Sequence, residues 1–475
     1  MLHQPGRVDE ECYAIPGLTI LERGVPQLPH MPSRNPLSMF YKADQVLYSE
    51  PPLFFYLQAL VYAIFPVSCA SSRVVSIVSG GLTIFIAATL AFRWTGKPLA
   101  AFFTAACLGL TKWFYYGIIL ARPDMLCTFL GLAAVLLTDN WVRTRKTKWL
   151  LGSGVMIGLA GLTLPLALAI AVQIAGWIFL ESKGLRRWLY PSLVALVSLA
   201  VFVLWIPQIA IDPEIFRIQF HNQFIENQLL VMDDAQPLSW FELVCMSLWS
   251  NARALVMYKG VYQFALIVAA LVAVTVWANI CGNRVTARAA WLSWSAFIIL
   301  SLLVGRAHHP GYWAFLGTLA CVNLGIFFVL IADWLIARFR QTGLAAAAIL
   351  GIGILASLLP GSGARLFPVY LRHWYQPNYQ VDRFAQQVLA AIPSDATCLV
   401  DRELVLNFIV AGRKTLALPV FPIFFDPTGY HYDYAIVGRT GLEVNVTENF
   451  QGTFVKSLGI ESDEFACFVK IYRRL

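Results

Sequence analysis

The sequence predicts an α-helical polytopic membrane protein with about ten transmembrane helices and a small C-terminal α/β domain. Three observations predict this class. Hydrophobic residues make up 58% of the 475 residues and charged residues 13%, whereas soluble domains carry about 25% charged residues. Arginines and lysines cluster in every second loop between apolar runs. After Pro360 the long apolar runs stop, and β-rich segments separated by Pro, Asp and Gly replace them.

The first predicted part, residues 1–70, is an N-terminal region outside the membrane. Nothing at its start resembles a signal peptide. It is rich in proline and contains the motif Tyr48-Ser-Glu-Pro-Pro-Leu53. The apolar run from Leu53 to Phe65 is too short to span a bilayer comfortably, which takes roughly 20 residues. It therefore predicts a helix lying at the membrane interface, with Tyr56 and Tyr62 at headgroup level.

The second part, residues 71–360, is predicted to hold the membrane spans. The candidate spans are 71–92, 98–119, 124–139, 149–163, 165–181, 189–208, 261–281, 289–304, 312–336 and 343–360. Between the sixth and seventh lies a large loop, 211–260, with an amphipathic stretch around Trp240–Met257.

Charge sets the predicted topology. The basic clusters are Arg93/Lys97, Arg143/Arg145/Lys146/Lys148, Lys183/Arg186/Arg187, Arg284/Arg288 and Arg338/Arg340. Positive-inside bias assigns these loops to the cytoplasm. The N-terminal region, the loop 211–260 and the tail then lie on the other side of the membrane. Because this bias accounts for the net charge of +8, we do not expect a nucleic-acid partner.

The third part, residues 361–475, is predicted to be a small extracytoplasmic α/β domain of roughly 100 residues. Val381–Ile392 has apolar residues at helical spacing. Thr397–Val400, Tyr434–Val437 and Phe465–Tyr472 are β-rich runs.

The unusual acids and histidines of the chain fall on the face opposite the basic loops, which favours a catalytic or binding surface there. Asp9 and Glu10 open this face, with Tyr13 following at helical spacing. A carboxylate at a membrane surface can act as a general base or hold a cation. The pair is equally typical of an acidic first turn of a helix, and the residues alone leave both interpretations open.

Arg122 and Asp124 flank Pro123 between two predicted spans. This triplet is typical of a helix start. It would also supply a second carboxylate and an arginine able to bind phosphate on the same face as Asp9.

Further candidates lie at three other places on this face. Glu50 precedes Pro51 and Pro52, a pair that fixes the entry angle of the following helix. A short loop holds Arg306, His308 and His309, a set suited to an anionic head group. Adjacent histidines are a weak metal signal, because their side chains diverge. Arg73 opens the next span, where it could contact a lipid phosphate or extend to the interface.

Together these residues resemble the GT-C superfamily of membrane glycosyltransferases, in particular the branch of protein O-mannosyltransferases and aminoarabinose (lipid A) transferases. The resemblance rests on Asp9-Glu10-Glu-Cys-Tyr13 with Gly24, on Tyr48-x-Glu-Pro-Pro-Leu53, on Arg73 and on Arg122-Pro-Asp124. Their order, the late His/Tyr/Pro loop and the external α/β tail also fit this branch.

The resemblance implies transfer of a sugar from a polyprenyl-phosphate donor to a lipid, glycan or protein acceptor, on the outer face of what we expect to be a bacterial plasma membrane. Asp9 would be the base or acceptor-positioning group, supported by Glu10, with Asp124 as the second acid. Arg122, Arg306 and His308 or His309 would neutralise the departing phosphate, and Arg73, Tyr13 and Glu50 are further site candidates.

Two features depart from the pattern. Relatives carry a span before the Asp-Glu loop, whereas eight residues precede Asp9 here, so we expect that the span is lost or that the start lies upstream. Relatives often carry Lys or His where this chain has Glu50, an anion that would repel phosphate unless it holds a cation. A divalent cation is therefore possible, although no oxygen-ligand cluster is evident.

Two other functions fit the sequence less well. A transporter or flippase of a lipid-linked saccharide would carry paired charges within its spans, and such charges are scarce here. A non-catalytic assembly subunit would fill the surfaces around Asp9 and Asp124 by packing. The catalytic interpretation is tested by whether Asp9, Asp124 and Arg306 converge on one pocket that is open to lipid.

Overall fold

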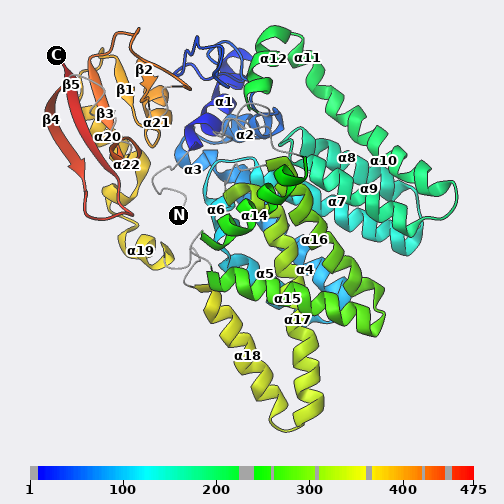
Figure 1. Cartoon of the computed structure of the whole chain (residues 1–475). Coiled ribbons are helices and arrows are strands. Elements are labelled where there is room, and N and C mark those ends of the chain that lie inside the picture. The colour runs from blue at the N-terminus through cyan, green and yellow to red at the C-terminus, as the bar shows by residue number, and fades with distance from the viewer. Residues whose placement is uncertain are drawn as a thin grey trace.

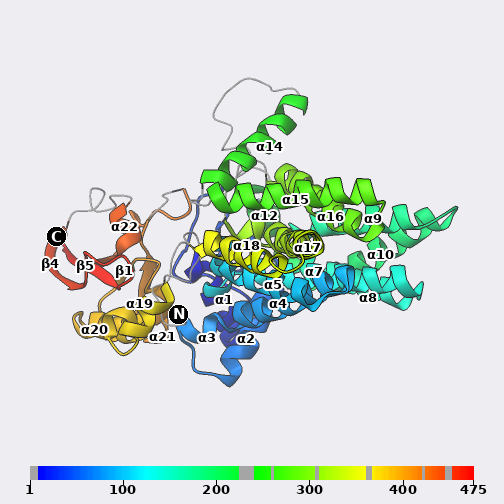
Figure 2. The same ribbon diagram turned by 90° about the horizontal axis from the view of Figure 1, so that it is seen from below.

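The computed structural model describes residues 9–223, 240–257, 261–304, 310–359, 366–419, 423–443 and 452–475. Most of its helices form one elongated bundle. A small α/β unit made by the C-terminal residues lies beside one end of that bundle, next to the N-terminal segment (Figures 1 and 2). The three parts of the chain therefore meet at a single end of the molecule.

The N-terminal segment contains helices α1 (Glu10–Arg23), α2 (Leu53–Ile64) and α3 (Cys69–Ser72). Helices α1 and α2 pack closely, since a Cβ atom at Gly17 would lie 2.6 Å from Oε1 of Gln58. The hydroxyl of Tyr62 donates a 2.8 Å hydrogen bond to the carbonyl of Ala14. Helix α1 ends at Gly24, whose φ of +80° favours glycine. The short helix predicted after Pro52 is present as α2.

A helix occupies each predicted membrane span. The bundle comprises α4 (Val74–Thr95), α5 (Pro98–Leu110), α6 (Lys112–Ile119), α7 (Asp124–Thr144), α8 (Lys148–Gly161), α9 (Ala167–Glu181), α10 (Arg186–Phe202), α15 (Val261–Cys281), α16 (Arg284–Val304), α17 (Ala314–Phe339) and α18 (Gly343–Leu358). The predicted span 98–119 is divided between α5 and α6, because the backbone is extended at Thr111.

Five helices among the described residues are long and apolar enough to cross a membrane: Cys69–Thr95, Asp124–Thr144, Arg186–Ile209, Arg284–Val304 and Gly311–Phe339. Five shorter apolar helices accompany them: Leu53–Ile64, Pro98–Leu110, Ala167–Glu181, Ala265–Cys281 and Gly343–Leu358. These helices indicate an integral membrane protein, and about ten crossings stays a prediction.

Helix packing follows the needs of a lipid-embedded bundle. Helix α17 is central, with 83% of its most apolar window buried, whereas the corresponding share for the helix containing α10 is 11%. Helices α8 and α10 approach closely because α8 presents glycines. A Cβ at Gly154 would lie 2.9 Å from the carbonyl of Val194, and one at Gly158 would lie 2.6 Å from that of Ser198. Small residues spaced four apart are typical of such contacts in membranes.

The C-terminal unit contains a five-stranded mixed sheet in the order β2-β1-β3-β5-β4. The strands are β1 (Cys398–Val400), β2 (Thr415–Ala417), β3 (Tyr434–Val437), β4 (Gly452–Gly459) and β5 (Phe468–Arg474), accompanied by α20 (Val381–Ala390), α21 (Val405–Val410) and α22 (Arg439–Glu443). Strand β1 pairs in parallel with both β2 and β3. The helix and the three strands predicted in this region correspond to α20, β1, β3 and β5, while β2 and β4 were not predicted.

The remaining described elements are the helix α14 (Trp240–Met257), which lies in the predicted amphipathic stretch, and the shorter η1 (Val203–Trp205), α11 (Ile206–Ile209), α12 (Pro213–His221), η3 (Pro310–Trp313), α19 (Leu366–His373) and η6 (Pro377–Tyr379). The predicted boundaries at residues 70 and 360, and the side of the membrane on which the α/β unit lies, stay predictions.

Candidate active site

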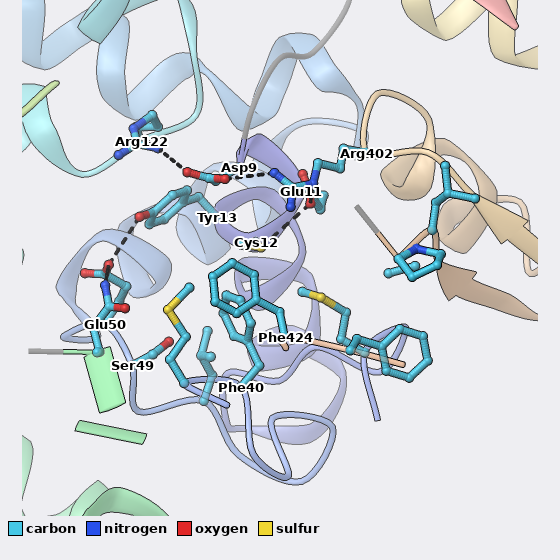
Figure 3. Close-up of a pocket in the computed structure, with 18 of the residues that line it drawn as sticks. Asp9, Glu11, Cys12, Tyr13, Phe40, Ser49, Glu50, Arg122, Arg402 and Phe424 are labelled. Carbon is cyan, nitrogen blue, oxygen red and sulfur yellow. Dashed lines mark hydrogen bonds and ion pairs between the residues drawn. The ribbon is translucent and has the colours of Figure 1, made fainter. Parts of the chain in front are cut away.

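A cavity of about 320 Å³ opens where the N-terminal segment, the end of the bundle and the C-terminal unit meet. One side is polar and the other is apolar (Figure 3). The polar lining residues are Asp9, Glu11, Tyr13, Ser49, Glu50, Arg122, Gln223, Tyr312 and Arg402, and the apolar ones include Met31, Met39, Phe40, Leu47, Phe424 and Phe425. A cavity with convergent polar groups and an apolar wall is typical of a small-molecule site.

Asp9 is the most accessible acid of this cavity, with 38% of its side chain exposed. It precedes the first turn of α1, but its side chain makes no capping hydrogen bond. Instead its carboxylate lies between two guanidinium groups (Figure 3): Oδ2 is 3.2 Å from Nη1 of Arg122, and Oδ1 is 3.0 Å from Nη1 of Arg402. The carboxylate therefore contacts the arginines of the cavity and does not cap the helix.

Arg122 is fully buried apart from the cavity, and three neighbours fix it. Its Nε donates a 2.8 Å hydrogen bond to Oδ2 of Asp124. Its guanidinium lies 4.9 Å from the ring centroid of Tyr13, within the range of a cation–π contact. Its carbonyl accepts a 3.0 Å hydrogen bond from Ser76 of α4. A guanidinium held this firmly can stabilise a developing negative charge without reorganising.

Asp124, predicted as a second catalytic acid, lies behind Arg122 and not on the cavity wall. It is the first residue of α7, and only 2% of its surface is exposed. Its carboxylate also touches the backbone at Gly311, where an added Cβ would lie 2.5 Å from Cγ of Asp124. The geometry therefore places Asp124 as the group that orients Arg122.

Glu50 lines the cavity opposite Arg122. Its Oε1 accepts hydrogen bonds of 3.2 Å from the hydroxyl of Tyr13 and 3.2 Å from Nε2 of Gln223. Within the described part of the chain, Oε2 has no hydrogen-bond partner and no cation pairs with the carboxyl. Burial raises the pKa of Glu50 to about 8. The raised pKa favours the neutral form of Glu50 near pH 7, which would lessen the expected repulsion of phosphate.

Among the charged residues that line the cavity, sequence reasoning did not propose Glu11 and Arg402. Nε of Arg402 lies 3.2 Å from Oε1 of Glu11, so one guanidinium contacts both Glu11 and Asp9. Burial raises the pKa of Glu11 to about 8, against the opposing charge of Arg402. A signal for Arg402 was present, because Asp401-Arg402-Glu403 directly follows a buried strand.

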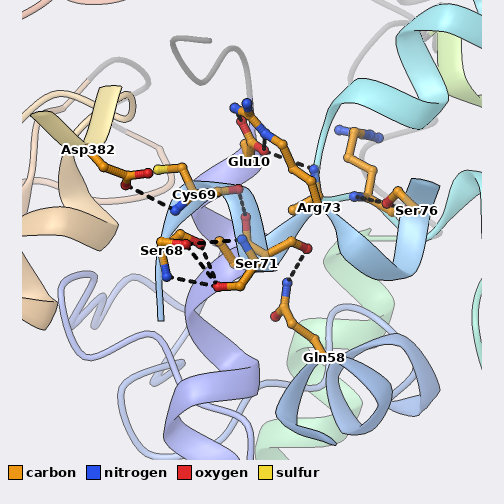
Figure 4. A network of polar contacts seen from close by, with 12 residues as sticks. Glu10, Gln58, Ser68, Cys69, Ser71, Arg73, Ser76 and Asp382 are labelled. Carbon is orange, nitrogen blue, oxygen red and sulfur yellow. Dashed lines mark hydrogen bonds and ion pairs between the residues drawn. The ribbon is translucent and has the colours of Figure 1, made fainter. Parts of the chain in front are cut away.

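Glu10 and Arg73 were predicted in the site, but the structure places them together outside the cavity (Figure 4). Nε and Nη2 of Arg73 donate hydrogen bonds of 2.7 and 2.8 Å to the two carboxylate oxygens of Glu10. Oε1 of Glu10 also accepts a 2.9 Å hydrogen bond from the backbone N–H of Ala121. This buried pair joins α1 to the start of α4, and neither residue lines the cavity.

Arg306, His308 and His309 lie outside the described residues, so their predicted role stays a prediction. The chain that follows them is placed at the site, since Gly311 contacts Asp124 and Tyr312 lines the cavity.

A metal site was left open by the sequence. Among the described residues, no group of three His, Cys, Asp or Glu side chains is arranged to hold a metal ion. The possible divalent cation therefore stays a prediction.

Comparisons with known proteins agree on one fold. Residues 49–211 match the family model described as dolichyl-phosphate-mannose-protein mannosyltransferase. The crystal structure of ArnT from Cupriavidus metallidurans bound to undecaprenyl phosphate aligns over 99% of this chain and 94% of its own, with a TM-score of 0.60 and 15% identity. The chain resembles the GT-C glycosyltransferases of the mannosyltransferase and ArnT branch.

A second solved structure supports the GT-C fold. The archaeal oligosaccharyltransferase AglB from Archaeoglobus fulgidus, in complex with an inhibitory peptide and a dolichol-phosphate, aligns over 98% of this chain and 70% of its own. The TM-score is 0.55 and the identity is 12%. The comparison with curated protein sequences gives no match.

The match to the mannosyltransferase family model covers only part of the site. Its range, 49–211, contains Glu50, Arg73, Arg122 and Asp124. Asp9 and Arg402 lie outside that range. Asp9 was predicted from the sequence, whereas Arg402 was found only in the structure, which places both at the cavity.

Proposed function

We propose that this protein is a glycosyltransferase that moves a sugar from a polyprenyl-phosphate donor to an acceptor at the non-cytoplasmic face of a bacterial plasma membrane. One observation carries the proposal: an accessible carboxylate, Asp9, lies between the guanidinium groups of Arg122 and Arg402 in a cavity at one end of the apolar bundle. A lipid-linked substrate needs its reactive end at such a place, at the edge of the bilayer.

The proposed reaction divides between Asp9 and Arg122. Asp9 takes the proton of the acceptor hydroxyl or amine as that group attacks the anomeric carbon of the sugar. The bond between the anomeric carbon and the phosphate oxygen breaks, and its electron pair stays on the phosphate. Arg122, held in place by Asp124, stabilises the charge on this leaving group.

The solved relatives support the donor class. ArnT was crystallised with undecaprenyl phosphate and AglB with a dolichol-phosphate and a peptide. By analogy the donor here is a polyprenyl-phosphate sugar, and the acceptor is a lipid, a glycan or a protein. Arginines and lysines cluster in every second loop, which assigns those loops to the cytoplasm. This supports an orientation with Asp9 and the C-terminal unit on the other side of the membrane.

The test is release of free polyprenyl phosphate from a panel of polyprenyl-phosphate sugars by the full chain in lipid nanodiscs, with and without a chelator and added divalent cation. We expect release by the wild type and a fall of about 10²–10⁴-fold in Asp9→Asn. The control is Asp44→Asn. The carboxylate of Asp44 pairs with Arg34 on the exterior of the same N-terminal segment.

Equal loss in Asp9→Asn and Asp44→Asn would contradict the catalytic role of Asp9. A folded wild type that releases no polyprenyl phosphate from any donor would contradict the proposed function. The chelator comparison decides whether a divalent cation takes part.

A further inference from the structure

The position of Arg402 follows from the topology of the C-terminal sheet. Arg402 comes two residues after β1, which lies between its parallel neighbours β2 and β3. The chain passes from β1 to β2 on one side and then to β3 on the other, so the strand order reverses at β1. The carboxyl end of a parallel strand at such a reversal is where open α/β sheets bind ligands. Here that end faces the cavity of the membrane bundle.

The backbone that carries Arg402 is fixed by a buried carboxylate. Oδ1 of Asp401 accepts a 2.7 Å hydrogen bond from the N–H of Arg402, and Oδ2 accepts a 2.8 Å hydrogen bond from the N–H of Gly441. Asp401 is fully buried. The loop after β1 therefore has a defined shape that directs the arginine side chain out of the sheet.

The whole C-terminal unit is in turn fixed to the N-terminal segment on the cavity's apolar side. The N–H of Ala417 donates a 2.8 Å hydrogen bond to the carbonyl of His30. The hydroxyl of Ser38 donates one of 2.9 Å to the carbonyl of Phe424, and the hydroxyl of Tyr430 donates one of 2.8 Å to the carbonyl of Pro32.

A further contact fixes the unit close to the bundle. Oδ1 of Asp382 in α20 accepts a 3.2 Å hydrogen bond from the N–H of Cys69, at the start of α3 (Figure 4). Contacts with the N-terminal loop and with α3, which directly precedes α4 of the bundle, define the position of Arg402 relative to Asp9.

The two arginines that hold Asp9 come from different parts of the molecule. Arg122 stands at the membrane helices and contacts Oδ2, whereas Arg402 stands on the sheet and contacts Oδ1. With one guanidinium on each oxygen, rotation of the carboxylate is restricted, yet 38% of the Asp9 side chain stays exposed. Loss of Arg402 would remove the ion-pair contact of Oδ1 and leave Asp9 paired with Arg122 through Oδ2.

We propose that Arg402 is a positioning residue for the carboxylate of Asp9, which makes the C-terminal α/β unit a working part of the active site. The proposal rests on the proposed function. We assign Arg402 a role through Asp9 because its Nη1 and Nε are directed at Asp9 and Glu11. The forked guanidinium matters, since the ammonium of a lysine cannot contact two separate carboxyl groups in the same planar arrangement.

The experiment compares Arg402→Ala and Arg402→Lys with wild type in the nanodisc assay, measuring kcat and the KM for the donor separately. Misplacing a reacting group by about 1 Å costs about 10²-fold in rate. We therefore expect kcat to fall about 10²-fold in Arg402→Ala with the donor KM unchanged. Millimolar guanidinium chloride should restore part of the Arg402→Ala rate, and Arg402→Lys should stay slow.

The matched control is Arg413→Ala. Arg413 belongs to the same unit, but it donates to the backbone carbonyls of Leu389, Ile392 and Pro393 and does not line the cavity. We expect Arg413→Ala to lower the melting temperature while kcat per folded molecule stays near that of wild type, without any response to guanidinium.

The outcomes separate this inference from the proposed function. An active wild type with an unchanged kcat in Arg402→Ala overturns the inference alone. A loss in Arg402→Ala that Arg413→Ala reproduces and guanidinium does not rescue also overturns it, because the role is then structural. A wild type that uses no polyprenyl-phosphate donor overturns the proposed function, and this inference with it.

Discussion

Glu10 and Arg73 form a buried, two-pronged ion pair directly beside the cavity that Asp9 enters. The two hydrogen bonds measure 2.7 and 2.8 Å, and the Arg73 side chain is wholly inaccessible to solvent. Neighbouring acids of one motif thus divide their work. The side chain of Asp9 lines the cavity. Glu10 binds Arg73 and so joins α1, the helix that follows Asp9, to the start of α4.

The first prediction concerns the stability that this ion pair provides. Removing one partner of a buried pair leaves an uncompensated charge and typically costs about 3–5 kcal/mol. We therefore expect Arg73→Met to lower the melting temperature in detergent markedly. Arg34→Met is the matched control, because Arg34 also binds a carboxylate through two hydrogen bonds but is half exposed, and such pairs contribute about 0–1 kcal/mol. Similar melting temperatures for the two variants would contradict the structural role of Arg73.

The second prediction concerns the pH dependence of activity. Because the pKa of Glu50 is raised to about 8, this side chain gains a negative charge as the pH rises through that value. An anionic Glu50 would repel the donor phosphate, so we expect the donor KM of the wild type to rise above about pH 8. Glu50→Gln keeps a neutral side chain at all pH values and should retain a low KM at pH 9. The comparison is Glu461→Gln, an exposed surface acid. A Glu50→Gln variant that loses affinity in the same way as wild type would contradict the prediction.

Much of the site could be predicted from the sequence, because charged side chains are excluded from the apolar part of a membrane protein and gather at its surfaces. Asp9, Tyr13, Glu50 and Arg122 were all predicted on one face, and all four line the same cavity. The helices of the bundle were equally accessible to prediction, since lipid requires long apolar runs.

Side-chain direction was the part that sequence could not decide. Successive residues of a helix point about 100° apart, so adjacent acids at the start of α1 cannot share one target. Which acid faces the cavity depends on how α1 rotates against α2, and this is set by packing such as that of Gly17 on Gln58.

Arg402 illustrates a second limit. It lies 393 residues from Asp9 in the sequence, and their contact depends on how the C-terminal unit packs against the N-terminal loop. Local patterns predict strand β1 and therefore a charged loop after it, but they carry no information on which surface that loop meets.

The third prediction concerns stability and pH. Glu11 and Glu50 have pKa values of about 8 in the folded chain, against an ordinary value of 4.5. Between these values the folded state binds more protons than the unfolded state, so stability falls as the pH rises. We expect the melting temperature to decrease steadily from about pH 5 to about pH 8. The double variant Glu11→Gln/Glu50→Gln should show a flatter profile over this range. A melting temperature that rises toward pH 8 in the wild type, or a double variant with the same slope, would contradict the burial argument.

The last prediction concerns Gly311, whose backbone lies against the carboxylate of Asp124, the residue that orients Arg122. A Cβ at this position would lie 2.5 Å from Cγ and 2.6 Å from both oxygens of Asp124. Asp124 is buried and hydrogen-bonded to Arg122, so relief of the clash must displace the arginine from the cavity wall. We expect Gly311→Ala to slow transfer about 10²-fold, the usual consequence of a 1 Å misplacement, in a protein that still folds. Gly353→Ala in α18 is the control, because its Cβ would meet nothing within 4 Å. Full activity in Gly311→Ala would contradict the prediction that the clash is relieved at Asp124 and Arg122.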